Sequence, residues 1–158
     1  MEELYKAGEI KAIGVSNFYP DRYIDLVQFS EVIPAVNQVE THVFNQQVKT
    51  HEIMIKYNKQ IESWGPFAEG KNDLFTNSTL QEVGEKYHIS TAQVTLRFLI
   101  QRGVVVIPKT VIKNRMEENI NVFDFELKTE DMSKIAALDT GESAFFSHYD
   151  PQTFEFLT

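Results

Sequence analysis

The stretch from Val104 to Asn121 carries residues whose types and spacing suit the binding of an anion. Lys109 and Thr110 follow Pro108 directly, and Arg115 lies shortly beyond them. An ammonium, a hydroxyl and a guanidinium group near the first amides of a helix are groups that bind phosphate in proteins. The same residues also fit a solvent-exposed corner between a strand and a helix with ordinary surface cations. Spacing alone leaves both interpretations open.

The elements around this stretch predict how the cations are positioned. Val104–Ile107 is a run of branched apolar residues, typical of a strand buried on both faces in a parallel sheet. Pro108 cannot donate a hydrogen bond to a neighbouring strand, so the strand is expected to end there. Asn114, with Glu117 three residues later, resembles a capping box and predicts a helix start. Arg115 then falls in the first helical turn, where the helix dipole favours anions.

The rest of the chain alternates between short apolar strands and amphipathic helices. Strands are expected at 12–16, 35–39 and 60–64. Helices are expected over 1–6, from Pro20, and over 46–57, 80–87, 91–102 and 130–138. Asn45 is the expected cap of the helix over 46–57, and Ser90 with Gln93 forms an expected capping box before the helix over 91–102. This order predicts an α/β fold with four parallel strands, either an open doubly wound sheet or part of a (β/α)8 TIM barrel. The chain lacks G-x-G-x-x-G and has polar residues after its strands, which favours the barrel.

Composition narrows the class of protein further. The chain has 158 residues, enough for one domain, and a formal net charge of −8, which argues against binding to nucleic acid or to an anionic membrane. It has no cysteine, so no disulfide forms, which is compatible with a reducing compartment. It also has no apolar run long enough to span a bilayer. A cytoplasmic protein is therefore expected.

With these residues placed, the sequence resembles the aldo-keto reductase family. The motifs that carry the resemblance stand in the family's order: IGVSNF (13–18), PAVNQVETH (34–42), WGPFAEG (64–70), QVTLRFLIQRG (93–103), VIPKT (106–110) and RMEEN (115–119). The resemblance implies that residues 1–158 form a single partial barrel domain. It also implies that this domain is the C-terminal half of the (β/α)8 barrel, which supplies strands five to eight.

The resemblance implies NADP(H) as the cofactor and assigns residues to its nicotinamide end. Ser16, Asn17 and Gln38 match the residues that hydrogen-bond the nicotinamide carboxamide, and Trp64 matches the aromatic residue on which the nicotinamide ring stacks. Without the resemblance, Trp64 would be interpreted as a core aromatic residue, and Ser16–Asn17 as a turn and a helix cap.

The resemblance also assigns residues to the remaining parts of the cofactor. Lys109, Thr110 and Arg115 match the group that holds the 2′-phosphate, which implies NADP(H) over NAD(H). The other matches are Glu118 and Asn119 near the adenine, Gly65 and Phe67 in a loop across the pyrophosphate, and Phe145, Phe146 and His148 in a variable substrate-pocket loop.

The family's reaction, hydride transfer to a carbonyl, requires residues that this chain is not expected to contain. The resemblance places the Tyr general acid and its Lys, Asp and His partners on strands two to four, before Met1. We therefore expect no catalytic residue here, and action on a small carbonyl substrate only after complementation. The alternative is a non-catalytic NADP(H)-binding module or a structural remnant of a truncated gene. Glu40 and His42 could form an acid/base pair or ligate a metal, but two ligands do not make a metal site.

Half of a barrel predicts a particular mode of assembly. Four strands that do not close leave two strand edges and one sheet face in water, which soluble monomers rarely tolerate. The sequence therefore predicts either self-association, such as two copies forming an eight-stranded pseudo-barrel, or pairing with a complementary N-terminal half.

Overall fold

The structure, a computed structural model, describes residues 1–147, 150, 152 and 155. His148 lies outside the described residues. The elements are, in chain order, α1 (Glu2–Lys6), β1 (Gly14–Ser16), α2 (Pro20–Phe29), β2 (Val36–Glu40), α3 (Val48–Lys56), β3 (Gln60–Trp64), the 3-10 segment η1 (Ala68–Thr76), α4 (Ser78–Tyr87), α5 (Thr91–Gln101), β4 (Val105–Val106), α6 (Lys113–Ile120) and α7 (Thr129–Ala136). Each strand is followed by at least one helix, as predicted.

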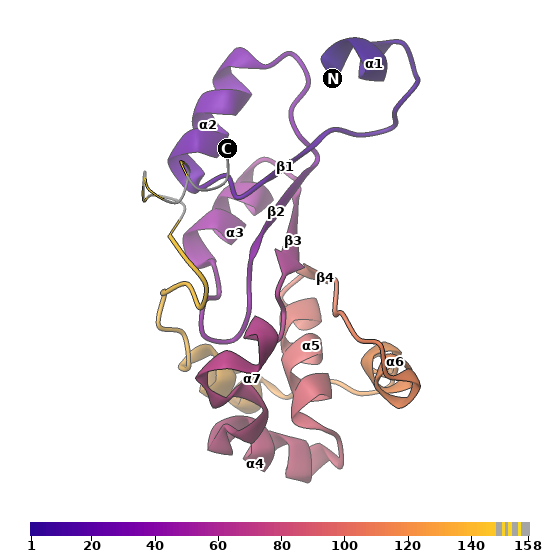
Figure 1. Ribbon diagram of the computed structural model, residues 1–158, viewed down its shortest axis with the longest axis vertical. Helices are drawn as coiled ribbons and strands as arrows, with labels where there is room; N and C mark the ends of the chain where they lie inside the picture. The colour runs from indigo at the N-terminus through magenta and orange to yellow at the C-terminus, as the bar shows by residue number, and fades with distance from the viewer. Residues whose placement is uncertain (148–149, 151, 153–154, 156–158) are drawn as a thin grey trace.

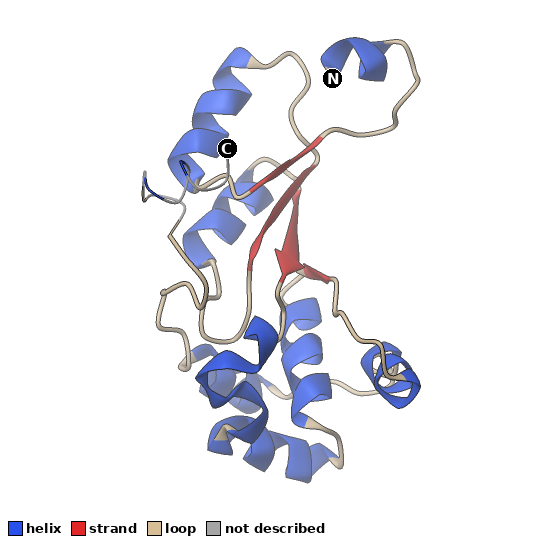
Figure 2. Cartoon of the chain, viewed as in Figure 1, coloured by secondary structure: helices blue, strands red, loops and turns tan. Residues whose placement is uncertain are grey.

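The four strands form one parallel sheet in the order β1-β2-β3-β4 (Figures 1 and 2). Ser16 pairs with Gln38, Gln38 with Glu62, and Glu62 with Val105. Helices α2 and α3 lie beside one end of the sheet, α4, α5 and α7 gather near the other, and α6 stands apart (Figure 1). The predicted α/β fold with four parallel strands is confirmed. No helix in the described part of the chain has the length and apolar character needed to cross a membrane.

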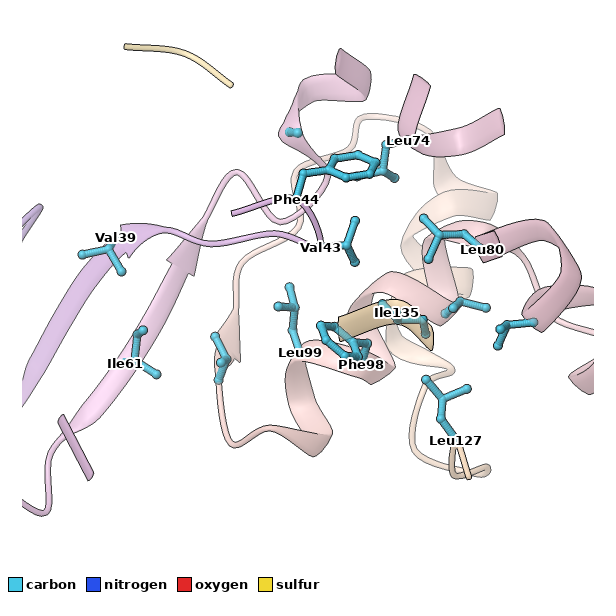
Figure 3. Packing of buried hydrophobic residues seen from close by; sticks show 14 of the residues in the cluster. Val39, Val43, Phe44, Ile61, Leu74, Leu80, Phe98, Leu99, Leu127 and Ile135 are labelled. Atoms are coloured by element: carbon cyan, nitrogen blue, oxygen red, sulfur yellow. The ribbon is translucent and has the colours of Figure 1, made fainter. Parts of the chain in front are cut away.

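The hydrophobic core lies between one face of the sheet and the helices. Val39 and Ile61 from the strands belong to the same cluster as Phe98 and Leu99 from α5 and Ile135 from α7, all almost fully buried (Figure 3). Successive strand residues point to opposite faces of a sheet. The core therefore takes alternate residues of each strand, and the others face away from it.

The prediction that Val104–Ile107 is a strand buried on both faces is wrong. The strand is shorter, and although Val104 is buried, Val105 is 43% exposed and Ile107 is 49% exposed. The helices pack on one face of the sheet only, and β4 is the last strand of the sheet. A run of branched residues indicates a strand, but it does not reveal whether a second layer covers it.

The predicted helix caps have mixed outcomes. The Ser90–Gln93 capping box at the start of α5 is confirmed, with both reciprocal hydrogen bonds present. Asn45 does not cap α3, because it exchanges backbone hydrogen bonds with His42, and Gln47 precedes the helix in the left-handed region, with φ 51°. Asn114 does not cap α6 either, because this helix already begins at Lys113.

Candidate functional site

The carboxyl ends of β1, β2 and β3 bring together the residues predicted to bind nicotinamide. The Ser16 hydroxyl and the Asn17 backbone N–H both donate to the Gln38 carbonyl oxygen, at 3.1 Å and 2.9 Å. The Trp64 indole N–H donates to the Asn17 side-chain oxygen at 2.7 Å. Ser16, Asn17, Gln38 and Trp64 therefore form one contiguous group.

The conformation of Asn17 explains how its amide reaches Trp64. Asn17 has a φ of 57°, in the left-handed region that Asn tolerates better than most residues. Behind it, the buried Asn37 side chain accepts from the Phe18 N–H at 3.3 Å and donates to the Phe18 carbonyl at 2.7 Å. These bonds fix the turn after β1 and hold the Asn17 amide at the sheet edge.

Gln38 has a partner that the sequence did not identify. Its side-chain N–H donates to a Glu62 carboxylate oxygen at 2.6 Å, because the two residues are register neighbours on β2 and β3. Within the described part of the chain, no donor reaches the side-chain oxygen of Gln38. This oxygen is therefore available to accept a hydrogen bond from a ligand.

The cations identified first in the sequence line a pocket beyond the carboxyl end of β4, the last strand of the same parallel sheet. A pocket of about 410 Å³ is lined by Lys109, Thr110, Arg115, Glu118 and Asn119. This volume is within the range of small-molecule sites, which is about 300–1,000 Å³. The other lining residues are Phe67, which was predicted, and Glu69, Gly70, Phe75, Ser90, Thr91 and Ala92, which were not. The capping box located the start of α5, but nothing local in the sequence links that helix to the site.

The charged residues that line the pocket are two cations, Lys109 and Arg115, and two acidic residues, Glu69 and Glu118. Lys109 and Arg115 are exposed and form no ion pair among the described residues, whereas Lys113 lies 3.8 Å from the Glu117 carboxylate. The Thr110 hydroxyl accepts from the Ile112 N–H at 3.2 Å, which orients it just before α6. The arrangement suits an anionic group placed among Lys109, Thr110 and Arg115.

The loop after β3 connects the two groups of residues. Gly65 has a φ of 62°, which allows the chain to turn directly after Trp64. The rings of Phe67 and Phe75 then pack 5.6 Å apart, and both line the pocket. The loop continues into η1, in which short 3-10 turns are interrupted by left-handed residues. The loop therefore runs from the Trp64 ring to the cationic pocket.

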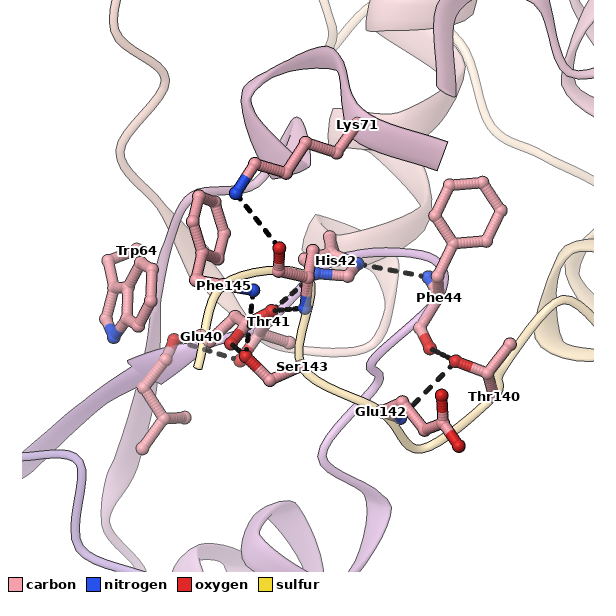
Figure 4. Close-up of polar contacts among 12 residues, drawn as sticks. Glu40, Thr41, His42, Phe44, Trp64, Lys71, Thr140, Glu142, Ser143 and Phe145 are labelled. Atoms are coloured by element: carbon pink, nitrogen blue, oxygen red, sulfur yellow. Dashed lines mark hydrogen bonds and ion pairs between the residues drawn. The ribbon is translucent and has the colours of Figure 1, made fainter. Parts of the chain in front are cut away.

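Glu40 and His42 form a buried pair instead of separate ligands (Figure 4). The Phe44 N–H donates to His42 Nδ1 at 3.2 Å, so Nε2 carries the proton and donates to Glu40 at 2.9 Å. Burial tends to raise the pKa of Glu40. Hydrogen bonds from His42, Ser143 and Ala144 oppose this effect and hold the pKa below its usual value. The pair joins the end of β2 to the C-terminal segment.

Comparisons with known proteins identify the family. Residues 1–140 match the Aldo/keto reductase family, and the chain belongs to it. It is 44% identical over 142 residues to the glyoxal reductase of Bacillus subtilis (strain 168), which covers 90% of the chain. It superposes with a TM-score of 0.90 and 39% identity on MGS-M4, an aldo-keto reductase enzyme from a Medee basin deep-sea metagenome library, over 95% of the chain. A mutant of Gox0644 in complex with NADPH matches 92% of the chain with a TM-score of 0.87 and 36% identity.

The chain spans about half the length of the relatives it matches. The matched part is 51% of the glyoxal reductase, 55% of the MGS-M4 chain and 53% of the Gox0644 chain. The family is therefore established over this segment, and the activity of a complete reductase is a separate question.

Proposed function

We propose that this chain is the C-terminal half of the barrel of an NADP(H)-dependent aldo-keto reductase and forms one structural unit that carries most of the cofactor site. The observation that carries the proposal is the pocket lined by Lys109, Thr110, Arg115, Glu118 and Asn119. These residues come from the β4–α6 connection and from α6 itself, yet they surround one volume. The NADPH complex of the Gox0644 mutant, which shares this fold, supports the cofactor's identity.

The two cations of the pocket that form no described ion pair favour NADP(H) over NAD(H). A 2′-phosphate adds negative charge that must be matched by cations. Lys109 and Arg115 have no described acidic partner, and the Thr110 hydroxyl lies in the same pocket. These three groups would hold the 2′-phosphate, while Glu118 and Asn119 would lie by the adenine.

The nicotinamide end would lie at the carboxyl ends of β1 to β3. The free side-chain oxygen of Gln38 would accept from the carboxamide N–H, and the Asn17 amide N–H could donate to the carboxamide oxygen while its own oxygen stays bonded to Trp64. The Trp64 ring would stack on the nicotinamide. When bound, NADP(H) supplies the hydride for a carbonyl group. The residues of this chain bind and orient the cofactor.

Two of the described tyrosines, Tyr23 and Tyr87, are held in contacts that do not suit proton donation to a carbonyl substrate. Tyr23 is fully buried, its O–H donates to the Pro34 carbonyl at 2.8 Å, and burial raises its pKa to about 12. The Tyr87 O–H donates to the buried Asp131 carboxylate at 2.6 Å, on the helix pair α4 and α7. Tyr149 lies outside the described residues. We therefore infer that the isolated chain binds the cofactor without turning over a carbonyl substrate.

A partner would cover the exposed face of the sheet and pair with its two end strands, β1 and β4. Exposed Val105 and Ile107 lie at β4. Together with α6, of which no residue is buried, they offer apolar surface for a complementary N-terminal half barrel or for a second copy of this chain. Light scattering at micromolar concentration tests self-association: a dimer or larger species is expected, and a monomer mass would remove that part of the proposal.

Calorimetric titration with NADPH and NADH tests the cofactor assignment. We expect weak NADPH binding and still weaker NADH binding, because only NADPH carries the 2′-phosphate. Equal affinity for both would contradict the role of Lys109 and Arg115. If neither bound at millimolar concentration, only the structural-remnant alternative would remain. Carbonyl-dependent oxidation of NADPH by the isolated chain would refute the inferred lack of turnover.

A further inference from the structure

The segment 140–146, here called the strap, is tied to the ends of the central strands at several points (Figure 4). Both the backbone N–H and the hydroxyl of Thr140 donate to the Phe44 carbonyl, at 2.9 Å and 2.8 Å. The Ser143 hydroxyl and the Ala144 N–H both donate to the Glu40 carboxylate, the latter at 2.7 Å. A buried carboxylate that receives charge-assisted hydrogen bonds is a strong anchor.

The strap places the Phe145 ring against Trp64. The ring centroids are 5.2 Å apart, with the planes tilted by 52°. On the other side, the Lys71 ammonium lies 4.1 Å from the Phe145 centroid and donates to the Ala144 carbonyl at 3.0 Å. Phe145 is therefore held between the indole ring and a cation, an arrangement that stabilises an aromatic ring in a fixed position.

The strap lies over the carboxyl ends of β2 and β3, where it contacts the side chains of Glu40 and Trp64. Glu40 and Trp64 are register partners in the parallel pairing of β2 with β3, and Glu62 lies on the same face as Trp64. The strap is anchored to the side chain of Glu40, so Phe145 meets Trp64 on the face that carries the candidate nicotinamide contacts.

We propose that Phe145 is a lid on the Trp64 ring, that the Glu40–His42 pair and Lys71 are positioning residues for this lid, and that Phe145 competes with any planar ring that stacks on Trp64. The identity of that ring as nicotinamide rests on the proposed function; the lid itself does not. Phe145 thereby selects what can occupy the space above Trp64, and the buried pair acts on ligand binding through the strap.

The lid can be tested without the cofactor, because Trp64 is the only tryptophan in the chain. The experiment measures quenching of its fluorescence in the full chain by acrylamide and by 1-methylnicotinamide, a planar ring without a phosphate. Removing the ring contact in Phe145→Ala should raise both quenching constants about twofold. Ser143→Ala and Lys71→Met, which weaken the attachment of the strap but keep the Phe145 ring, should raise them by a smaller factor. Phe29→Ala, an exposed phenylalanine at the end of α2 and outside the strap, is the matched control and should leave them unchanged.

These variants keep the test independent of Glu40, whose replacement acts on a buried pair and could unfold the chain. Unchanged quenching in Phe145→Ala, or an equal increase in Phe29→Ala, would overturn the lid. NADPH titration then adds a second readout: loss of the competing ring contact should tighten NADPH binding by about two- to tenfold in Phe145→Ala. Weaker binding in that variant would overturn the competition. If NADPH bound to neither protein, the proposed function would fail, while the 1-methylnicotinamide result would still decide the lid.

Discussion

The indole N–H of Trp64 donates to the side-chain oxygen of Asn17 at 2.7 Å, and this bond joins the end of β3 to the turn after β1 across the intervening strand β2. The two residues are far apart in sequence, and both were assigned to the nicotinamide end of the cofactor. Their contact fixes the orientation of the Trp64 ring before any ligand arrives, which lowers the ordering cost of binding.

Two substitutions of Asn17 separate its backbone role from its side-chain role. Asn17→Ala and Asn17→Gly both remove the hydrogen bond to Trp64, but only Gly adopts the left-handed conformation without a steric cost. We expect Asn17→Ala to be less stable than Asn17→Gly by about 1 kcal/mol. Urea denaturation followed by circular dichroism measures the difference. Equal stability would show that the turn relaxes out of the left-handed region.

Loss of the Lys109 ammonium should weaken NADPH binding specifically. We expect Lys109→Ala to cost about 1.5–3 kcal/mol of NADPH binding free energy, the scale of a hydrogen bond to a charged group, and much less for NADH. Lys113→Ala is the matched control, because Lys113 pairs with Glu117 and is not among the residues that line the pocket. Equal losses in both variants, measured by calorimetry, would indicate general electrostatic attraction without a defined phosphate site.

Acid should destabilise the protein through Glu40. The pKa of Glu40 is lowered in the folded chain, so its carboxylate contributes stability that is fully present above its ordinary pKa of 4.5 and is lost as the pH falls through the lower folded value. Glu40→Gln should therefore be less stable than the parent at pH 7, and the difference should shrink in acid. Glu142→Gln, on the exposed part of the strap, is the control. The measurement is the melting temperature of each protein at several pH values from 3 to 7, a range of about four units that includes the ordinary pKa. A stability difference between Glu40→Gln and the parent that did not depend on pH would contradict the prediction.

Gly84 should resist replacement by alanine even though it lies in a helix. In an exposed helix this change stabilises by about 1 kcal/mol, but a Cβ at Gly84 would lie 2.7 Å from the Ile89 carbonyl oxygen. We expect Gly84→Ala to destabilise the chain by about 1–3 kcal/mol, because backbone must move to make room. Gln81→Ala on the exposed side of α4 should be neutral or slightly stabilising. A gain in stability for Gly84→Ala would mean that the α4–α5 turn is more adaptable than the structure indicates.

The sequence predicted most of the order of elements and missed features that depend on tertiary contact. The expected strand at 60–64 ends just before Gly65-Pro66 and matches the bounds of β3, and the α5 capping box follows from local hydrogen-bonding chemistry. The exposure of Val105 depends on what covers the sheet, and Asn45 is held by a backbone contact outside the helix, so neither could be inferred locally.

In the candidate site too, some features could be predicted from the local sequence and others depend on tertiary contacts. Lys109, Thr110 and Arg115 were identified from their residue types and family motif, and the structure brings them to one pocket. The bond from Gln38 to Glu62 and the packing of Phe145 on Trp64 arise from strand register and from the path of the strap. Neither has a signature in the neighbouring sequence.

Fluorescence of Trp64 during NADPH titration tests the central claim most directly, because Trp64 and Lys109 lie in the two different groups of the proposed site. If one dinucleotide spans both groups, NADPH should quench Trp64, and Lys109→Ala should shift the midpoint of that quenching to higher concentration. Binding detected by calorimetry without any change in Trp64 fluorescence, or no binding at millimolar NADPH, would contradict the account.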